Sequence, residues 1–202
     1  MQLKLNGFAA KLQYSVTALA LAAACSSTAF AQDAHTHMQS SAQQNDTALA
    51  DQSGADTLVQ MVRQATARFQ DVAVAEAAGY ALVFGCVSGD DFGAMGLHYL
   101  NADILNSGVL DPMRPQIVIY EPNPDGTKRL IGADFLVFAD AWNANHTAPP
   151  QLLGQAFHLF TSPNRFNLPA FYTLHVWAWK SNPQGAFVNW HPNVSCQSFT
   201  AH

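Results

Sequence analysis

The sequence is poor in basic residues: 9 Lys and Arg stand against 14 Asp and Glu, for a formal net charge of −5. These basic residues are scattered along the chain and form no cluster. Nucleic acids and anionic membrane surfaces are bound through dense positive patches, so the composition argues against both as partners. The same scarcity leaves a buried carboxylate few cationic side chains that could neutralise it.

The chain also lacks a hydrophobic run of the roughly 20 residues that cross a bilayer. Its most apolar stretch, Val16 to Ala24, follows Lys4 and Lys11 and precedes the A-x-A motif Ala29-Phe30-Ala31. A basic start, a short apolar core and a small-residue cleavage site are typical of a secretory signal peptide. We therefore interpret residues 1–31 as a signal peptide and predict an exported protein, periplasmic or secreted, without a membrane span.

Cysteine is scarce, with three in the whole sequence. Cys25 lies within the signal segment and leaves a lipoprotein as the alternative, although Leu21 stands one position too early for a lipid-attachment motif. Cys86 and Cys196 remain in the mature chain, and an even number in an exported protein predicts one disulfide bond. A catalytic thiol at Cys86 is the competing interpretation.

The mature chain divides into a polar tract and one domain. Residues 32–55 are rich in Gln, Ser, Ala and Asp without apolar periodicity, which predicts a disordered linker. Within this tract, His35-Thr36-His37-Met38 offers the imidazole and thioether groups that suit copper, or simply two solvated histidines. Residues 56–202 are long enough for a single domain with a substantial core.

The pattern of the domain predicts an α+β fold. Apolar residues recur at three- and four-residue spacing from Asp56 to Ala78, as in a helix that Gly79 would end, and Asp71 is a candidate N-cap for a second, shorter helix. Beyond Gly79, apolar strands are separated by turn signals without intervening helical segments. We expect one helix or a helix pair packed on an antiparallel sheet of six or seven strands, curled or barrel-like.

A histidine lies at the centre of the most strand-like segment, residues 171–180, whose aromatic and β-branched composition suits a strand. The turn residues 181–185 predict a hairpin with residues 186–190, and the resulting register would place His175 opposite His191. His175 shares its predicted strand face with Phe171, Thr173, Trp177 and Trp179, and the opposite face is apolar, so the strand is expected to be buried on both faces. A buried neutral histidine needs hydrogen-bond partners or a metal ion.

Further polar residues lie in strands that are otherwise apolar. Asp134 is in the middle of the segment 130–138, which is apolar on both faces, so its carboxylate requires a cation, a metal or several donors. His98 follows a glycine-rich turn, and Glu121 ends the strand that begins at Ile117. An ideal hairpin would separate Glu121 from Asp134 by about 13 Å, too far for both to bind one ion.

Three functions remain open at this point. His98 and His175 with one carboxylate, Asp134 before Glu121, would suit a mononuclear zinc or iron site, with His191 as a secondary residue, capable of hydrolysis or oxygen chemistry. Alternatively, an aromatic-lined cavity would make the chain a small-molecule binding protein. Its predicted lining is Trp142, Trp177, Trp179, Phe187 and Trp190. In the third interpretation the buried polar residues only specify packing.

Several motifs, taken in order, resemble a family of exported bacterial proteins of uncharacterised function. They are Met95-Gly96-Leu97-His98-Tyr99, Tyr120-Glu121-Pro122, Leu174-His175-Val176-Trp177-Ala178-Trp179 and Asn182-Pro183-Gln184-Gly185, followed by Pro192 to Cys196. The resemblance covers roughly residues 65–196. This chain departs from the family pattern at Asp134, where Glu is expected, and at His191, where Asn is expected. The resemblance implies export and no particular activity.

Overall fold

The computed structural model describes residues 33–200, and the side chains of residues 47–200. The predicted signal peptide with Cys25 lies outside the described residues, and so do the side chains of His35 and His37. The chain falls into two units, residues 1–40 and 41–202, and the second contains the domain. Within residues 33–200, no helix combines the length and the apolar character needed to span a bilayer.

The helices precede the sheet in sequence. α1 (Asp33–Thr66) is followed by the short 3-10 helix η1 (Ala67–Phe69) and by α2 (Val72–Ala77). The predicted break is confirmed, because the Asp71 side chain caps α2 by accepting a hydrogen bond from Ala73 N at 2.9 Å. α1 already begins at Asp33, and the predicted disordered linker at residues 32–55 stays a prediction. The tract has good helix formers, no proline and a single glycine.

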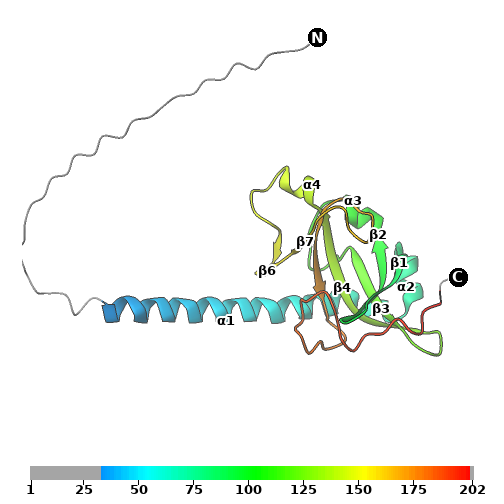
Figure 1. Ribbon diagram of the computed structural model, residues 1–202, viewed down its shortest axis with the longest axis horizontal. Helices are drawn as coiled ribbons and strands as arrows, with labels where there is room; N and C mark the ends of the chain where they lie inside the picture. Colours follow the sequence, from blue (N-terminus) through cyan, green and yellow to red (C-terminus); the bar gives the residue numbers. More distant parts are fainter. Residues whose placement is uncertain (1–32, 201–202) are drawn as a thin grey trace, which may run out of the picture. The chain divides into compact units, whose positions relative to one another are not determined.

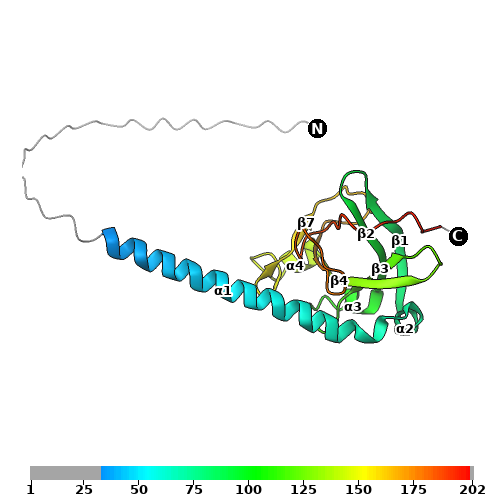
Figure 2. The same cartoon turned by 90° about the horizontal axis from the view of Figure 1, so that it is seen from below.

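Six antiparallel strands form the main sheet, in the order β1-β2-β3-β4-β8-β7. Their bounds are β1 (Tyr80–Gly89), β2 (Gly93–Asn101), β3 (Ile117–Pro122), β4 (Lys128–Phe138), β7 (His158–Phe160) and β8 (Phe171–Val176). The connections hold α3 (Ala102–Asn106), α4 (Ala139–Asn143) and the hairpin β5 (Gln151–Leu152) with β6 (Gln155–Ala156). The sheet curls into a half-barrel (Figures 1 and 2), which confirms the predicted α+β class.

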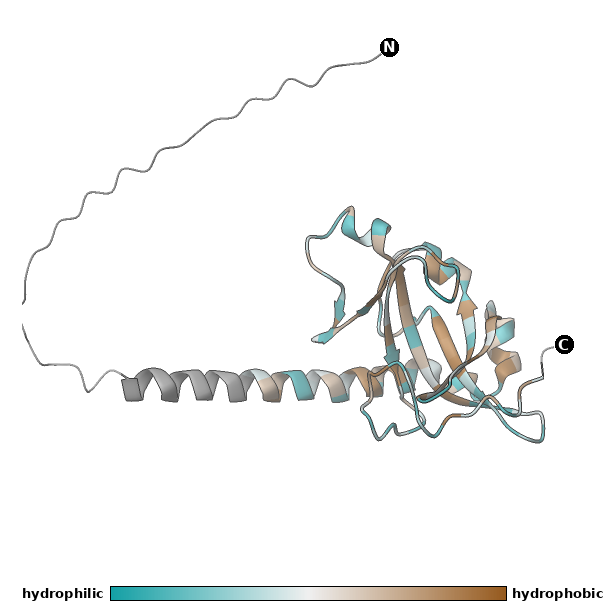
Figure 3. Ribbon diagram, viewed as in Figure 1, coloured by the Kyte–Doolittle hydropathy of each residue, from teal (hydrophilic) through white to brown (hydrophobic). Residues whose placement is uncertain are grey.

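Opposite faces of the sheet serve different purposes. On one face, Leu58 and Val62 of α1 are fully buried in a cluster with Phe135, Leu174 and Val176. Residues of the alternate positions, such as Leu136 and Phe171, belong to a second cluster on the inner face. Figure 3 shows how hydrophobic residues concentrate along the strands of the curled sheet. The predicted alternation along residues 171–176 is therefore confirmed.

The predicted hairpin after β8 is wrong. β8 ends at Val176 and pairs with β4 and β7, and residues 186–190 form no strand. The turn chemistry is real, since Gly185 N donates to Asn182 O at 3.1 Å, but it bends a covering loop rather than joining two strands. His191 pairs instead with Ala94 as an isolated bridge, so it does not lie opposite His175.

The predicted disulfide is confirmed. Cys86 on β1 and Cys196 near the C-terminus are bonded, with their Cα atoms 5.7 Å apart. The bond excludes Cys86 as a free catalytic thiol. Cys86 directly follows an irregularity in β1, where Val83 pairs with His98 and Cys86 with Leu97, so that Phe84 and Gly85 bulge out of the ladder.

Candidate metal centre

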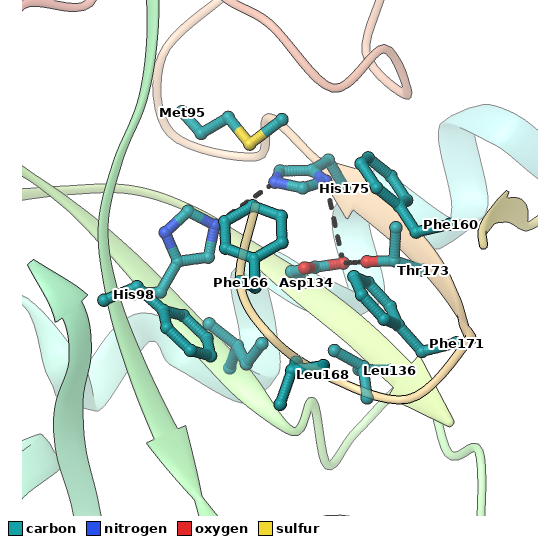
Figure 4. Close-up of a pocket in the computed structure, with 12 residues that line it drawn as sticks. Met95, His98, Asp134, Leu136, Phe160, Phe166, Leu168, Phe171, Thr173 and His175 are labelled. Carbon is teal, nitrogen blue, oxygen red and sulfur yellow. Dashed lines mark hydrogen bonds and ion pairs between the residues drawn. The ribbon is translucent and has the colours of Figure 1, made fainter. Parts of the chain in front are cut away.

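Three strands bring two histidines and one carboxylate together on the inner face of the sheet. His98 comes from β2, Asp134 from β4 and His175 from β8, and Asp134 and His175 are direct register partners. One ligand atom from each residue lies within 4.8 Å of the other two. All three side chains are buried, with residue exposures of 6, 3 and 2 %. The predicted convergence of His98, Asp134 and His175 is thus present in the structure (Figure 4).

The curl of the sheet makes this convergence possible. Two strands, β3 and β4, lie between β2 and β8. In a flat sheet, strands three steps apart are separated by about 14 Å, too far for two imidazoles on one face to touch. Here the Nε2 atoms of His98 and His175 are 3.4 Å apart. The curl therefore closes the inner face around the two rings.

The backbone fixes the orientation and tautomer of His98. Its Nδ1 lies 3.2 Å from the carbonyl oxygen of Gly96, which can only accept, so Nδ1 carries the proton and Nε2 presents a lone pair. Gly96 has φ +92°, and a Cβ there would lie 2.6 Å from Tyr120 O. Glycine is therefore required at this position, both for the left-handed backbone and for the close approach of β3.

His175 is held less completely. Its Nδ1 lies 3.7 Å from Asp134 Oδ1, beyond hydrogen-bond distance, and is one of two buried side-chain atoms without a partner among the described residues; the other is Asn189 Oδ1. Asp134 Oδ1 accepts a hydrogen bond from Thr173 Oγ1 at 2.5 Å. A carboxylate, two imidazoles and an unpartnered ring nitrogen are consequently enclosed together.

Burial dominates the protonation of the cluster. It lowers the pKa of His98 to about 4, with a further lowering by His175 and an opposing effect of Asp134. It lowers the pKa of His175 to about 3, where His158 adds to the shift and Asn189 opposes it. Burial also raises the pKa of Asp134 to about 6, against the influence of His98 and the Thr173 hydrogen bond. Both imidazoles are neutral at pH 7, which is the form that binds metals.

Glu121, predicted as an alternative ligand, lies elsewhere. Its carboxylate accepts hydrogen bonds from Lys180 Nζ at 2.8 Å and from Arg129, and Ser195 N approaches it at 3.3 Å. The carboxylate is therefore already neutralised. Among the described residues, the ion pairs of Lys and Arg all go to Glu121 and leave Asp134 facing His175.

His191 is also separate from the cluster. Its Nε2 lies 3.1 Å from Ser181 O, and its Nδ1 accepts from Asn193 N at 3.1 Å. The ring of Trp177 packs edge-on against His191, with ring centroids 5.0 Å apart. Both nitrogens of His191 are satisfied by the loop that follows β8, so this residue organises the loop.

A small pocket opens on the cluster. Around His98, Asp134 and His175 it is lined mostly by apolar side chains, four of them phenylalanines: Phe84, Phe160, Phe166 and Phe171. The predicted lining residues Trp177, Trp179 and Trp190 do not line this pocket. Trp177 Nε1 donates to Val188 O at 2.6 Å, and Trp179 Nε1 donates to Thr66 Oγ1 at 2.9 Å.

The sequence analysis missed several residues of the site. Thr173 was placed on the correct face but given no role, although it fixes the Asp134 carboxylate. The phenylalanines of the pocket come from β1, β7, β8 and the loop before β8, and no local pattern joins them. The glycine at position 96, two residues before His98, was the one available signal for a carbonyl that contacts the imidazole.

Comparison of the chain with models of known families, with curated proteins and with solved structures found no match.

Proposed function

We propose that His98, His175 and Asp134 bind one divalent metal ion, zinc or iron, through the two Nε2 atoms and a carboxylate oxygen. Two nitrogens bound to a tetrahedral ion at about 2.0–2.1 Å lie about 3.3 Å apart. The observed Nε2–Nε2 distance is 3.4 Å. The ligand atoms of the cluster all lie within 4.8 Å of one another.

The hydrogen-bond pattern carries the proposal. Because His98 Nε2 has a lone pair and no proton, a hydrogen bond at 3.4 Å in the metal-free protein requires His175 to donate from its Nε2. His175 Nδ1 would then face the Asp134 carboxylate as a second acceptor, without a proton between them. A cation between the two Nε2 atoms removes this conflict, since His175 Nδ1 then carries a proton that Asn189 Oδ1 or the Asp134 carboxylate can accept. Histidine ligands commonly have their other ring nitrogen held by a carbonyl or a carboxylate.

The proposed site is of the open type. Three protein ligands leave at least one coordination position for an exogenous ligand, as in catalytic zinc sites and in iron sites with two histidines and one carboxylate. The pocket faces that position, which favours a chemical role over a purely structural one. A bound ion of either kind would polarise a ligand or activate a water molecule there.

We further infer that the protein works outside the cytoplasm. The sequence begins with a signal-peptide pattern, and the disulfide between Cys86 and Cys196 fits an oxidising compartment.

Metal analysis of the purified protein, combined with melting curves, tests the proposal. Wild-type protein loaded with Zn²⁺ or Fe²⁺ should bind close to one ion, and a chelator should lower its melting temperature. His175→Ala should bind no stoichiometric metal, and the chelator should leave its melting temperature unchanged. The matched control is His146→Ala, because His146 is an exposed histidine outside the cluster. The proposal would be overturned if wild-type protein bound no metal and its melting temperature did not respond to the chelator. If His175→Ala were still destabilising in that case, His175 would be a packing residue.

A further inference from the structure

The pocket above the cluster is small. Its volume is about 30 Å³. This is the space open to the centre of a water-sized sphere, so the pocket holds only a few water-sized atoms. The floor of the pocket is polar, formed by the two histidines and Asp134, whereas the walls are phenylalanine, leucine, isoleucine and methionine.

One wall of the pocket is a loop held by several hydrogen bonds. The loop before β8 contributes Phe166 and Leu168, and Asn164 ties this loop together through four hydrogen bonds. Its Oδ1 accepts from Phe166 N and Leu168 N, and its Nδ2 donates to Thr161 O and Leu168 O, at 2.9–3.3 Å. Arg165 then anchors the loop to β1 by donating to Ser88 O at 3.0 Å.

A neighbouring part of the pocket wall contains a residue with a strained backbone, Phe84. Phe84 has φ +63°, which is unfavourable for a residue with a Cβ, and lies in the bulge of β1 beside the residue that pairs with His98. Bulges commonly redirect a side chain next to a functional site. Here the ring of Phe84 contacts that of Phe166, with centroids 5.2 Å apart, and both line the pocket.

We propose that the open coordination position accepts a neutral diatomic ligand, with dioxygen as the natural class, and excludes larger ligands by its phenylalanine walls. This inference rests on the proposed metal site. The volume admits only a few heavy atoms. Apolar walls disfavour polar or charged occupants, because these would lose hydration without gaining hydrogen bonds. Of the two candidate metals, iron with two histidines and one carboxylate is the one that binds dioxygen.

Nitric oxide and imidazole separate the possibilities. The full protein, loaded with one equivalent of Fe²⁺ without oxygen, should give an iron–nitrosyl electron paramagnetic resonance signal with nitric oxide. Imidazole, a five-membered ring, should leave that signal unchanged in the wild type. In Phe166→Ala, imidazole should compete with nitric oxide about tenfold or more strongly than in the wild type, because the imidazole ring no longer has to displace the Phe166 side chain. Phe92→Ala is the control, since Phe92 is exposed and does not line the pocket.

Each outcome decides a different point. An iron-loaded wild type without a nitrosyl signal would overturn the open position and leave metal binding intact. Equal competition by imidazole in the wild type and in Phe166→Ala would overturn exclusion by size. Failure to take up iron or zinc would instead overturn the proposed function. If Phe166→Ala does not fold, Leu168→Ala removes part of the same wall and should show the same change in competition.

Discussion

At the scale of single residues, two buried carboxylates differ in what surrounds them. Burial alone would raise the pKa of Glu121, but hydrogen bonds from Lys180 and Arg129 outweigh it and hold that pKa below its ordinary value. Asp134 has no such partners among the described residues, and burial raises its pKa to about 6. Glu121 is therefore an internally neutralised structural ion pair, whereas Asp134 has a carboxylate still in need of a cation.

Replacing Asp134 should affect the metal-bound and metal-free states in opposite ways. We expect Asp134→Asn to weaken metal binding by about 10–100-fold, because the site loses its negative ligand. The metal-free variant should be at least as stable as metal-free wild type, since a buried charge without a cation is costly. Metal titration and urea unfolding with chelator check the two effects. A metal-free Asp134→Asn that is clearly less stable than wild type would assign Asp134 to a self-sufficient packing network.

Replacing Glu121 should change the response to acid. A carboxylate with a lowered pKa in the folded state adds stability above its unfolded pKa and loses it as pH falls through the folded value. Glu121→Gln should cost about 1–3 kcal/mol at pH 7, of which Arg129 supplies a small part because its side chain is half exposed. The loss should shrink as pH falls below about 5 and through the lowered folded-state pKa of Glu121. Urea unfolding across this range measures it, with exposed Asp90→Asn as the control; a pH-independent difference would contradict the ion-pair explanation.

At the scale of elements, only part of α1 holds the domain together. Residues 47–53 are exposed, whereas Gly54 lies against Leu153, where a Cβ would approach the carbonyl oxygen to 2.4 Å, and Leu58 is fully buried. The helix thus becomes part of the core near Gly54. The predicted boundary at residue 56 remains a prediction about folding, to be tested by truncation.

Changes in the two parts of α1 should have different effects on stability. Deleting residues 32–50 should lower the melting temperature by less than about 2 °C, because the segment is polar in sequence and its residues 47–50 are exposed. Leu58→Ala should instead cost about 2–5 kcal/mol by leaving a cavity against β4 and β8. Thermal unfolding compares the two changes directly. A large effect of the deletion would mean that the segment contributes contacts to the domain beyond those of residues 54–66.

The elements also show what the sequence could and could not predict. Periodicity identified the segment from Phe171 and its two faces, because alternation is a local property of one strand. The prediction that this strand pairs with residues 186–190 was wrong. Residues 181–185 have turn chemistry, but the strand before them has already ended at Val176. The true neighbour of His175 is Asp134, on a strand that no tight turn connects to it. Polarity in an apolar strand identified both residues, but only the sheet order brings them together.

At the scale of the whole molecule, the disulfide closes a long loop. Cys86 and Cys196 are 110 residues apart and enclose every ligand of the proposed site. Replacing both cysteines by serine should cost about 4–5 kcal/mol by restoring freedom to the unfolded chain. Guanidinium unfolding measures this loss, and thiol titration of the denatured, non-reduced chain 32–202 should find no free thiol. Two reactive thiols in that experiment would contradict the disulfide.

The sheet order also sets the sequence of events in which the site can appear. β1 to β4 are neighbours in both sequence and space, so they can pair as they are synthesised. β8 arrives last and must settle between β4 and β7, and it carries His175. A partly synthesised chain that ends at residue 170 therefore contains two of the three proposed ligands, His98 and Asp134, but lacks His175. If the proposed site binds metal, uptake of the ion would report that β8 has paired with β4, and a chain that ends before β8 would not retain the ion.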